Sequence, residues 1–186
     1  MVLDDINIKE VFKQGTNLNV WQYDRLRGIV KKLMKYDQNK DCFGDHHLFK
    51  LMMDIISHYN LYVVKKNFVT TAGIVIGTPY LDKKVMAVAY VVAKKYRNIG
   101  IGSELLGRAI KTCFEECECL EISLSASVDN IPSRKMIEKN HFSLVSEDST
   151  ELRKGEQVKQ VRYSLDYNQY IKEYDNFKKY KTLFER

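Results

Sequence analysis

The spacing of apolar residues changes along this chain, and the order of these changes constrains the fold more than any other feature. Near the N-terminus, apolar side chains recur at intervals of three and four, which predicts helices over Val20–Tyr36 and His46–Tyr59. The pattern then becomes that of strands rich in β-branched residues, over Leu61–Val64, Phe68–Thr78 and Val85–Val92. Because the last strand is apolar on both faces, we expect it at the centre of a sheet.

The rest of the chain alternates between the two patterns. Helical spacing predicts helices over Ser103–Cys117 and Pro132–Lys139, and three further segments alternate as strands. A short, weakly alternating segment at the N-terminus adds an edge strand. This order predicts one layered α/β (α+β) domain with a mixed sheet. The four strands concerned are Ile6–Phe12, Leu120–Ser127, Phe142–Glu147 and Gln157–Leu165.

Size and charge narrow the class of protein. The chain has 186 residues, 45% of them hydrophobic, which suffices for one domain that needs no disulfide or metal to stabilise its core. Its formal charge of +6 is compatible with an anionic cofactor, with nucleic acid or with solubility alone. Since like charges never form a long run, a basic arm or an acidic tail is excluded.

The sequence also indicates a cytoplasmic protein. Its apolar stretches are too short to cross a bilayer, and the first residues lack the pattern of a secretory signal, so we expect no membrane association. Three of the four cysteines, Cys113, Cys117 and Cys119, lie close together without histidines at zinc-binding spacing. We therefore expect reduced thiols and no metal site.

A glycine-containing turn joins the central strand to the next amphipathic helix. Backbone amides at a helix N-terminus have no partner within the helix and carry the positive end of its dipole, so they bind phosphate. Gly100 and Gly102 remove side chains that would block an anion, and Lys94, Lys95 and Arg97 add positive charge. The segment therefore predicts a phosphate-binding site.

Two familiar phosphate-binding motifs do not match this turn. A dinucleotide fingerprint requires a third glycine where Leu105 stands. A P-loop requires Lys and then Ser or Thr after its second glycine, but Arg108 and Ala109 follow Gly107. A turn that binds no ligand is the remaining alternative on this segment alone.

Three segments of the sequence resemble motifs of one known family. The residues from Arg97 to Gly102 match the coenzyme A motif Q/R-x-x-G-x-G/A at every defined position, and Asn130 to Ser133 match N-x-x-S/A. The residues from Glu138 to Phe142 resemble E-K-x-G-F. Over most of residues 6–165 the chain thus resembles the GNAT superfamily of acyl-CoA N-acyltransferases. The resemblance implies a mixed sheet of six to seven strands with a splayed central pair and about four flanking helices. It divides the chain into an N-acetyltransferase domain, 1–166, and a C-terminal tail, 167–186.

The resemblance also implies acetyl-CoA as co-substrate and no metal. In the family, amides at the helix start hold the pyrophosphate, and the exposed edge of the central strand pairs with pantetheine like an added strand. The motif asparagine donates a hydrogen bond to pantetheine, although Asn130 is also suited to cap the following helix. The implied cofactor-binding residues are Tyr90, Val91, Val92, Arg97, Asn98, Ile99, Gly100, Ile101, Gly102, Ser103, Asn130 and Ser133.

The catalytic groups cannot be assigned from the motifs. Acyl transfer to an amine needs a base for the ammonium, a donor for the oxyanion and, where the thiolate is protonated, an acid. The family supplies the oxyanion donor from a backbone amide, here near Val92. Its acid is often a tyrosine at the position of Ile137, and His141 stands in place of its glycine. The polar residues expected near the cleft are Tyr90, Ser125, Ser127 and Asp129, with His46, His47 and His141 as further candidates.

The C-terminal segment interleaves aromatic and basic residues at near-helical spacing. Such a stripe favours a terminal helix that covers its own domain or a dimer partner, and RNA stacking is the alternative. The stripe consists of Tyr167, Tyr170, Ile171, Tyr174, Phe177 and Phe184.

Overall we predict an N-acetyltransferase that acts on a primary amine by direct attack through a tetrahedral intermediate. We expect it to bind acetyl-CoA and an unidentified amine, and not nucleic acid; a homodimer is left open. The alternatives are an acyl-CoA-binding regulatory module and a toxin-like acetyltransferase acting on aminoacyl-tRNA.

Overall fold

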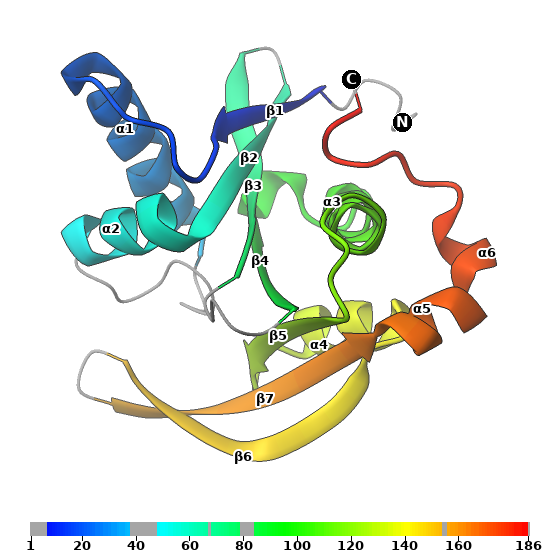
Figure 1. The fold of residues 1–186 in the computed structure, drawn as a ribbon. Coiled ribbons are helices and arrows are strands. Elements are labelled where there is room, and N and C mark those ends of the chain that lie inside the picture. The colour runs from blue at the N-terminus through cyan, green and yellow to red at the C-terminus, as the bar shows by residue number, and fades with distance from the viewer. Residues whose placement is uncertain (1–6, 38–47, 67, 79–83, 154–155, 186) are drawn as a thin grey trace.

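The computed structural model describes residues 7–37, 48–66, 68–78, 84–153 and 156–185, and for 148–153 and 156 the backbone only. One seven-stranded sheet has the order β1-β2-β3-β4-β5-β7-β6 (Figure 1). Its strands are β1 (Asn7–Phe12), β2 (Tyr59–Lys66), β3 (Val69–Gly77), β4 (Val85–Val92), β5 (Glu121–Ser127), β6 (Ser143–Arg153) and β7 (Glu156–Asp166). The α-helices are α1 (Val20–Tyr36), α2 (Leu48–His58), α3 (Ile101–Lys111), α4 (Ile131–Lys139), α5 (Tyr167–Lys172) and α6 (Tyr174–Phe177).

The predicted mixed α/β fold is confirmed, and some predicted bounds are corrected. The helix predicted from Ser103 begins earlier because Gly100 takes a left-handed φ of 88° and acts as its N-cap. That helix ends in a π-helical turn, Thr112–Glu116. Strand β6 continues past Glu147, where its alternation fades, because its backbone goes on pairing with β7.

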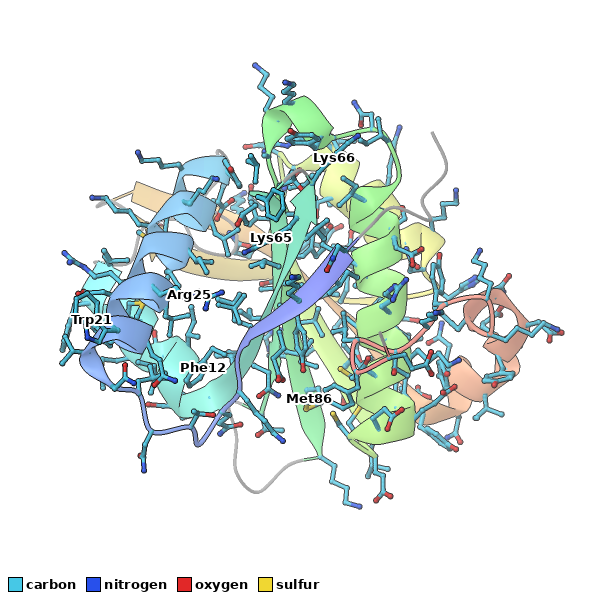
Figure 2. All side chains as sticks on the ribbon, turned by 90° about the horizontal axis from the view of Figure 1, so that it is seen from above. Phe12, Trp21, Arg25, Lys65, Lys66 and Met86 are labelled. Atoms are coloured by element: carbon cyan, nitrogen blue, oxygen red, sulfur yellow. The ribbon has the colours of Figure 1, made fainter. Side chains whose placement is uncertain are left out.

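Two hydrophobic cores lie on opposite faces of the sheet. The helices α1 and α2 cover one face, and α3, α4 and the C-terminal segment cover the other, as the view from above shows (Figure 2). Along β4, Ala89 and Val91 face α1 and α2, whereas Val88, Tyr90 and Val92 face α3. Burial of apolar area on both faces is the main source of stability, at about 25 cal/mol per Å².

The C-terminal segment packs along α3 and returns towards β1 (Figure 1). Tyr180 lies against Gly107, where a Cβ atom would collide with its ring. The amide of Leu183 donates to Thr112 Oγ1 at 2.7 Å, and Lys111 Nζ donates to the carbonyl of Tyr180 at 3.1 Å. The prediction of a helix for the whole segment is wrong beyond Phe177, because these contacts hold residues 178–185 in an irregular path.

The central strands β4 and β5 separate along their length. They pair in parallel only from Val85 to Ala87 of β4, and the two strands then diverge (Figure 1). Each keeps its outer partner, β4 with β3 and β5 with β7. Since the amide of Ala93 donates to the carbonyl of Thr71 on the β3 side, alternation turns the backbone groups of Tyr90 and Val92 towards the opening. The expected splay is thus present.

In the part of the chain that the structure describes, no helix is both long enough and apolar enough to span a membrane.

Candidate active site

A cavity of about 690 Å³ occupies the opening between β4 and β5. Its walls come from β4, the turn and first residues of α3, the strand β5, the helix α4 and the C-terminal end of α1. The lining residues are Asp37, Val88, Ala89, Tyr90, Val91, Val92, Lys94, Arg97, Asn98, Gly100, Gly102, Ser103, Leu124, Ser125, Asn130, Pro132, Ser133, Lys135, Met136 and Lys139.

All but two of the predicted cofactor-binding residues line this cavity. The exceptions are Ile99, whose side chain is partly exposed outside it, and Ile101, whose side chain is buried in the core beneath α3. The resemblance assigns these two residues a role through their backbone amides, so the positions of their side chains leave that prediction unchanged. The two separate motifs, one before α3 and one before α4, therefore meet at one place.

The turn before α3 exposes backbone amides to the cavity. Asn98 and Gly100 both adopt left-handed φ values, 60° and 88°. The first helical hydrogen bond runs from the amide of Glu104 to the carbonyl of Gly100 at 3.0 Å. The amides of the residues between them have no acceptor within the helix, which is the arrangement that suits an anion.

Gly102 lies where a side chain would be crowded by its neighbours. A Cβ atom there would be 3.3 Å from the Sδ atom of Met136 on α4 and 3.7 Å from Cγ2 of Val92 on β4. The glycine therefore keeps the space between β4 and α4 open in front of the α3 amides.

Basic side chains gather around the same turn. Lys94, Arg97, Lys135 and Lys139 line the cavity, whereas Asp37 is the one acidic lining residue among those described. Lys95, which was expected beside the phosphate, lies instead with its Nζ 5.9 Å from the centroid of the Tyr96 ring. This charge balance favours an anionic ligand.

Arg97 also has a structural role. Its Nε donates to the carbonyl of Val92 at 3.0 Å, and its Nη2 donates to the carbonyl of Tyr36 at 2.9 Å. The guanidinium thus ties the end of β4 to the end of α1 at the rim of the cavity. The sequence motif predicted a positive charge here but not these two partners.

Substitution of Arg97 tests this link. Because hydrogen bonds from a charged group contribute about 1.5–3 kcal/mol and this side chain is partly exposed, Arg97→Gln should lower the free energy of unfolding by about 1–3 kcal/mol. Urea denaturation measures the change. Lys95→Gln removes a neighbouring charge without these bonds and serves as control. Equal stability of the two variants would contradict the structural role.

Asn130, Ser133 and Tyr90 meet across the cavity. Asn130 caps α4, since its Oδ1 accepts from the amide of Ser133 at 3.4 Å. The Ser133 hydroxyl lies 2.7 Å from the Tyr90 hydroxyl, so β4 and α4 are joined by a direct side-chain hydrogen bond. The capping role considered for Asn130 is therefore observed, and the same residue also lines the cavity.

The remaining catalytic candidates are distributed differently. Ile137 has 0% exposure and belongs to the core, so α4 provides no hydroxyl at that position. His141 is outside the cavity lining: it has a left-handed φ of 65°, and its Nδ1 lies 3.5 Å from Glu173 Oε2. This φ explains why a glycine suits the position. Of the other candidates, Ser125 lines the cavity and Ser127 and Asp129 do not, whereas His46 and His47 lie outside the described residues.

Sequence reasoning missed three lining residues of interest. Met136 follows Ser133 by one helical turn, so the i,i+3 spacing within α4 could have revealed it. No comparable feature of the sequence indicates that Lys135 lines the cavity. Asp37, which is 8% exposed, comes from the distant end of α1 and is brought to the cavity by the link from Tyr36 to Arg97.

The three cysteines that the structure describes, Cys113, Cys117 and Cys119, are absent from the lining of this cavity. Burial raises the pKa of Cys117 to about 11, and a hydrogen bond with Cys119 raises the pKa of Cys113. Both thiols are therefore protonated at neutral pH and poor nucleophiles. Within the described ranges, no group of three or more His, Cys, Asp or Glu side chains is placed to hold a metal ion.

Comparison with known proteins gives consistent results. Residues 31–142, more than half of the chain, match the model of the Acetyltransferase (GNAT) family. A search of curated proteins gives no significant match. Among solved structures, the fold is similar to a mutant of SpeG spermidine N-acetyltransferase from Vibrio cholerae, with a TM-score of 0.67 and 13% identity over 90% of this chain and 97% of that one. It is also similar to IAA acetyltransferase from Bacillus cereus, with a TM-score of 0.61 and 15% identity over 87% and 99%. At these identities the structural likeness shows the fold alone.

Proposed function

Because this chain belongs to the acetyltransferase (GNAT) family, we propose that it transfers the acetyl group of acetyl-CoA to a primary amine. The amine attacks the thioester carbonyl directly, and the reaction passes through a tetrahedral intermediate. The observation that carries this proposal is the opening between β4 and β5, which has amides and basic side chains at one end.

The shape of the opening suits the parts of acetyl-CoA. The amides at the start of α3 and the side chains of Lys94, Lys135 and Lys139 would hold the phosphates. The pantetheine chain would run along β4, where its amides add to the backbone edge at Tyr90 and Val92 as an extra strand does. The same edge would supply an N–H donor to the oxyanion of the tetrahedral intermediate.

The similar structure from Vibrio cholerae is named a spermidine N-acetyltransferase, which makes polyamines one class of acceptor to test here. The location that we propose for the enzyme is the cytoplasm, as the sequence led us to expect.

Release of coenzyme A thiol tests the activity. The purified chain is mixed with acetyl-CoA and a panel of amines that includes spermidine, an aminoglycoside, free amino acids, a lysine-containing peptide and aminoacyl-tRNA. We expect thiol release that depends on one class of amine, together with the matching N-acetyl product by mass spectrometry.

The buried Ile137 supports one alternative, an acyl-CoA-binding module without turnover. That function predicts a rise in the melting temperature with acetyl-CoA and no thiol release with any amine. Such a pair of results would contradict the enzymatic proposal while leaving the cofactor site in place.

A further inference from the structure

The hydroxyl of Tyr90 lies inside the proposed cofactor opening and is held there from the opposite wall. Tyr90 comes from β4, beyond Ala87, where the pairing with β5 has ended. Its hydroxyl is 2.7 Å from the hydroxyl of Ser133 on α4, and both residues line the cavity. The phenol is therefore fixed between β4 and α4, which form two walls of the cavity.

The position of Tyr90 along β4 is significant. Phosphate-binding amides lie at the start of α3, after the C-terminal end of β4, and Tyr90 lies further into the opening than Val92. An extended chain that entered past Gly102 and ran along β4 would reach Val92 first and Tyr90 next. The thioester end of pantetheine would therefore lie close to Tyr90, and the phosphates would lie further from this residue.

Other proton donors in the lining are less suited to this place. Ile137, one helical turn after Ser133, is buried and carries no donor. The three lysines of the lining, Lys94, Lys135 and Lys139, are exposed to solvent, whereas Tyr90 is half-buried and packs against the core beneath α3. A tyrosine hydroxyl can both donate and accept a hydrogen bond, so it is able to donate a proton here.

On the basis of the proposed function, we propose that Tyr90 is the catalytic residue that donates a proton to the departing sulfur of coenzyme A. Ser133 is the positioning residue that holds the phenol in the opening. Either hydroxyl of this pair can be the donor in the hydrogen bond between them. When the phenol donates to sulfur, the Ser133 hydroxyl is therefore able to turn and donate to the phenolate oxygen.

Two bonds change and two protons move in this step. The lone pair of the amine nitrogen forms a C–N bond to the acetyl carbon, and the electron pair of the C–S bond leaves with the sulfur. Tyr90 donates its phenolic proton to that sulfur, which gives the thiol of coenzyme A. The proton that the nitrogen loses returns through solvent to the phenolate, so Tyr90 is restored and one amide and one thiol are formed.

Titration of bound coenzyme A tests this role without knowledge of the acceptor. The ultraviolet absorbance of the thiolate is followed against pH for coenzyme A bound to the wild-type chain and to Tyr90→Phe. A phenol that donates to the thiolate stabilises it, so loss of the hydroxyl should raise the pKa of the bound thiol by about one to two units. Tyr96→Phe removes a hydroxyl outside the cavity lining and should leave that pKa unchanged.

Kinetics with the best amine of the panel provide a second measurement. Tyr90→Phe should lower kcat about 100-fold and leave KM for acetyl-CoA within a few-fold of wild type. Ser133→Ala should lower kcat less, and Ser133→Thr, which keeps a hydroxyl, should restore it.

The possible failures are distinct. An equal thiol pKa in wild type and Tyr90→Phe, with coenzyme A bound to both, would overturn the role of Tyr90 and leave the proposed function standing. Failure of the wild-type chain to bind coenzyme A would overturn the proposed function, and the role of Tyr90 with it.

Discussion

Gly102→Val is expected to weaken the binding of acetyl-CoA by at least about 100-fold. A valine at this position would push against Met136 and Val92 and fill the space in front of the α3 amides. Two charge-assisted hydrogen bonds to phosphate would then be lost or lengthened, each contributing about 1.5–3 kcal/mol, and about 1.4 kcal/mol corresponds to tenfold in affinity. Isothermal titration calorimetry with acetyl-CoA measures the change, and circular dichroism reports whether the fold is intact.

The chain offers a matched control for this substitution. Gly28 lies on the exposed side of α1, and a Cβ atom there would meet nothing within 4 Å. Gly28→Val therefore makes the same chemical change in open space, and its affinity should equal that of the wild type. Equal affinities for acetyl-CoA in Gly102→Val and Gly28→Val would mean that the phosphates bind elsewhere.

Phe177→Ala should have the largest effect on stability. This ring at the end of α6 is 1% exposed and packs against Tyr170, with ring centroids 5.3 Å apart. Truncation of a buried phenylalanine costs about 3–5 kcal/mol, a large part of the 5–15 kcal/mol that stabilises a typical domain. Urea denaturation followed by fluorescence or circular dichroism measures the loss.

Phe184→Ala is the corresponding control in the same segment. Phe184 is 49% exposed and has only a tilted ring contact with Tyr62, at 6.3 Å between centroids, among the ring pairs of the described residues. Its truncation should cost about 1 kcal/mol or less. If the two variants were equally stable, residues 173–185 would not be part of the folded core.

The two predictions are connected through α3. The C-terminal segment covers the side of α3 that carries Gly107, and it bonds to Thr112 and Lys111 at the end of that helix. The other end of α3 carries the amides proposed to bind phosphate. Loss of the segment should therefore affect the cofactor site indirectly, through the stability of the helix that supports it.

The elements that the sequence predicts accurately are those whose signals are local. The bounds of α1 and β4 agree with the periodicity, and α1 begins with a capping box in which Asn19 and Gln22 bond to each other's backbone. The residues before α3 and α4, which the resemblance assigns to one cofactor site, line the same cavity, and each motif combines a strand end with a helix start. Gly100 suits the left-handed turn before α3, and Asn130 suits the cap of α4, so both positions carry a local signal.

The features that the sequence does not predict depend on contacts between distant segments. Asp37 reaches the cavity because Arg97 bonds to the carbonyl of Tyr36, far from it in sequence. The path of residues 178–185 depends on Tyr180 fitting against Gly107, which no periodicity records. The partnership of Tyr90 with Ser133 likewise requires that β4 and α4 be placed in space.

A crystal structure of the chain with acetyl-CoA tests the central claim most directly. We expect the pantetheine chain in the opening between β4 and β5, its amides paired with the backbone of Tyr90 and Val92, and the pyrophosphate at the amides that begin α3. Acetyl-CoA bound outside this opening, or an opening closed by β4 pairing with β5 beyond Ala87, would contradict the account.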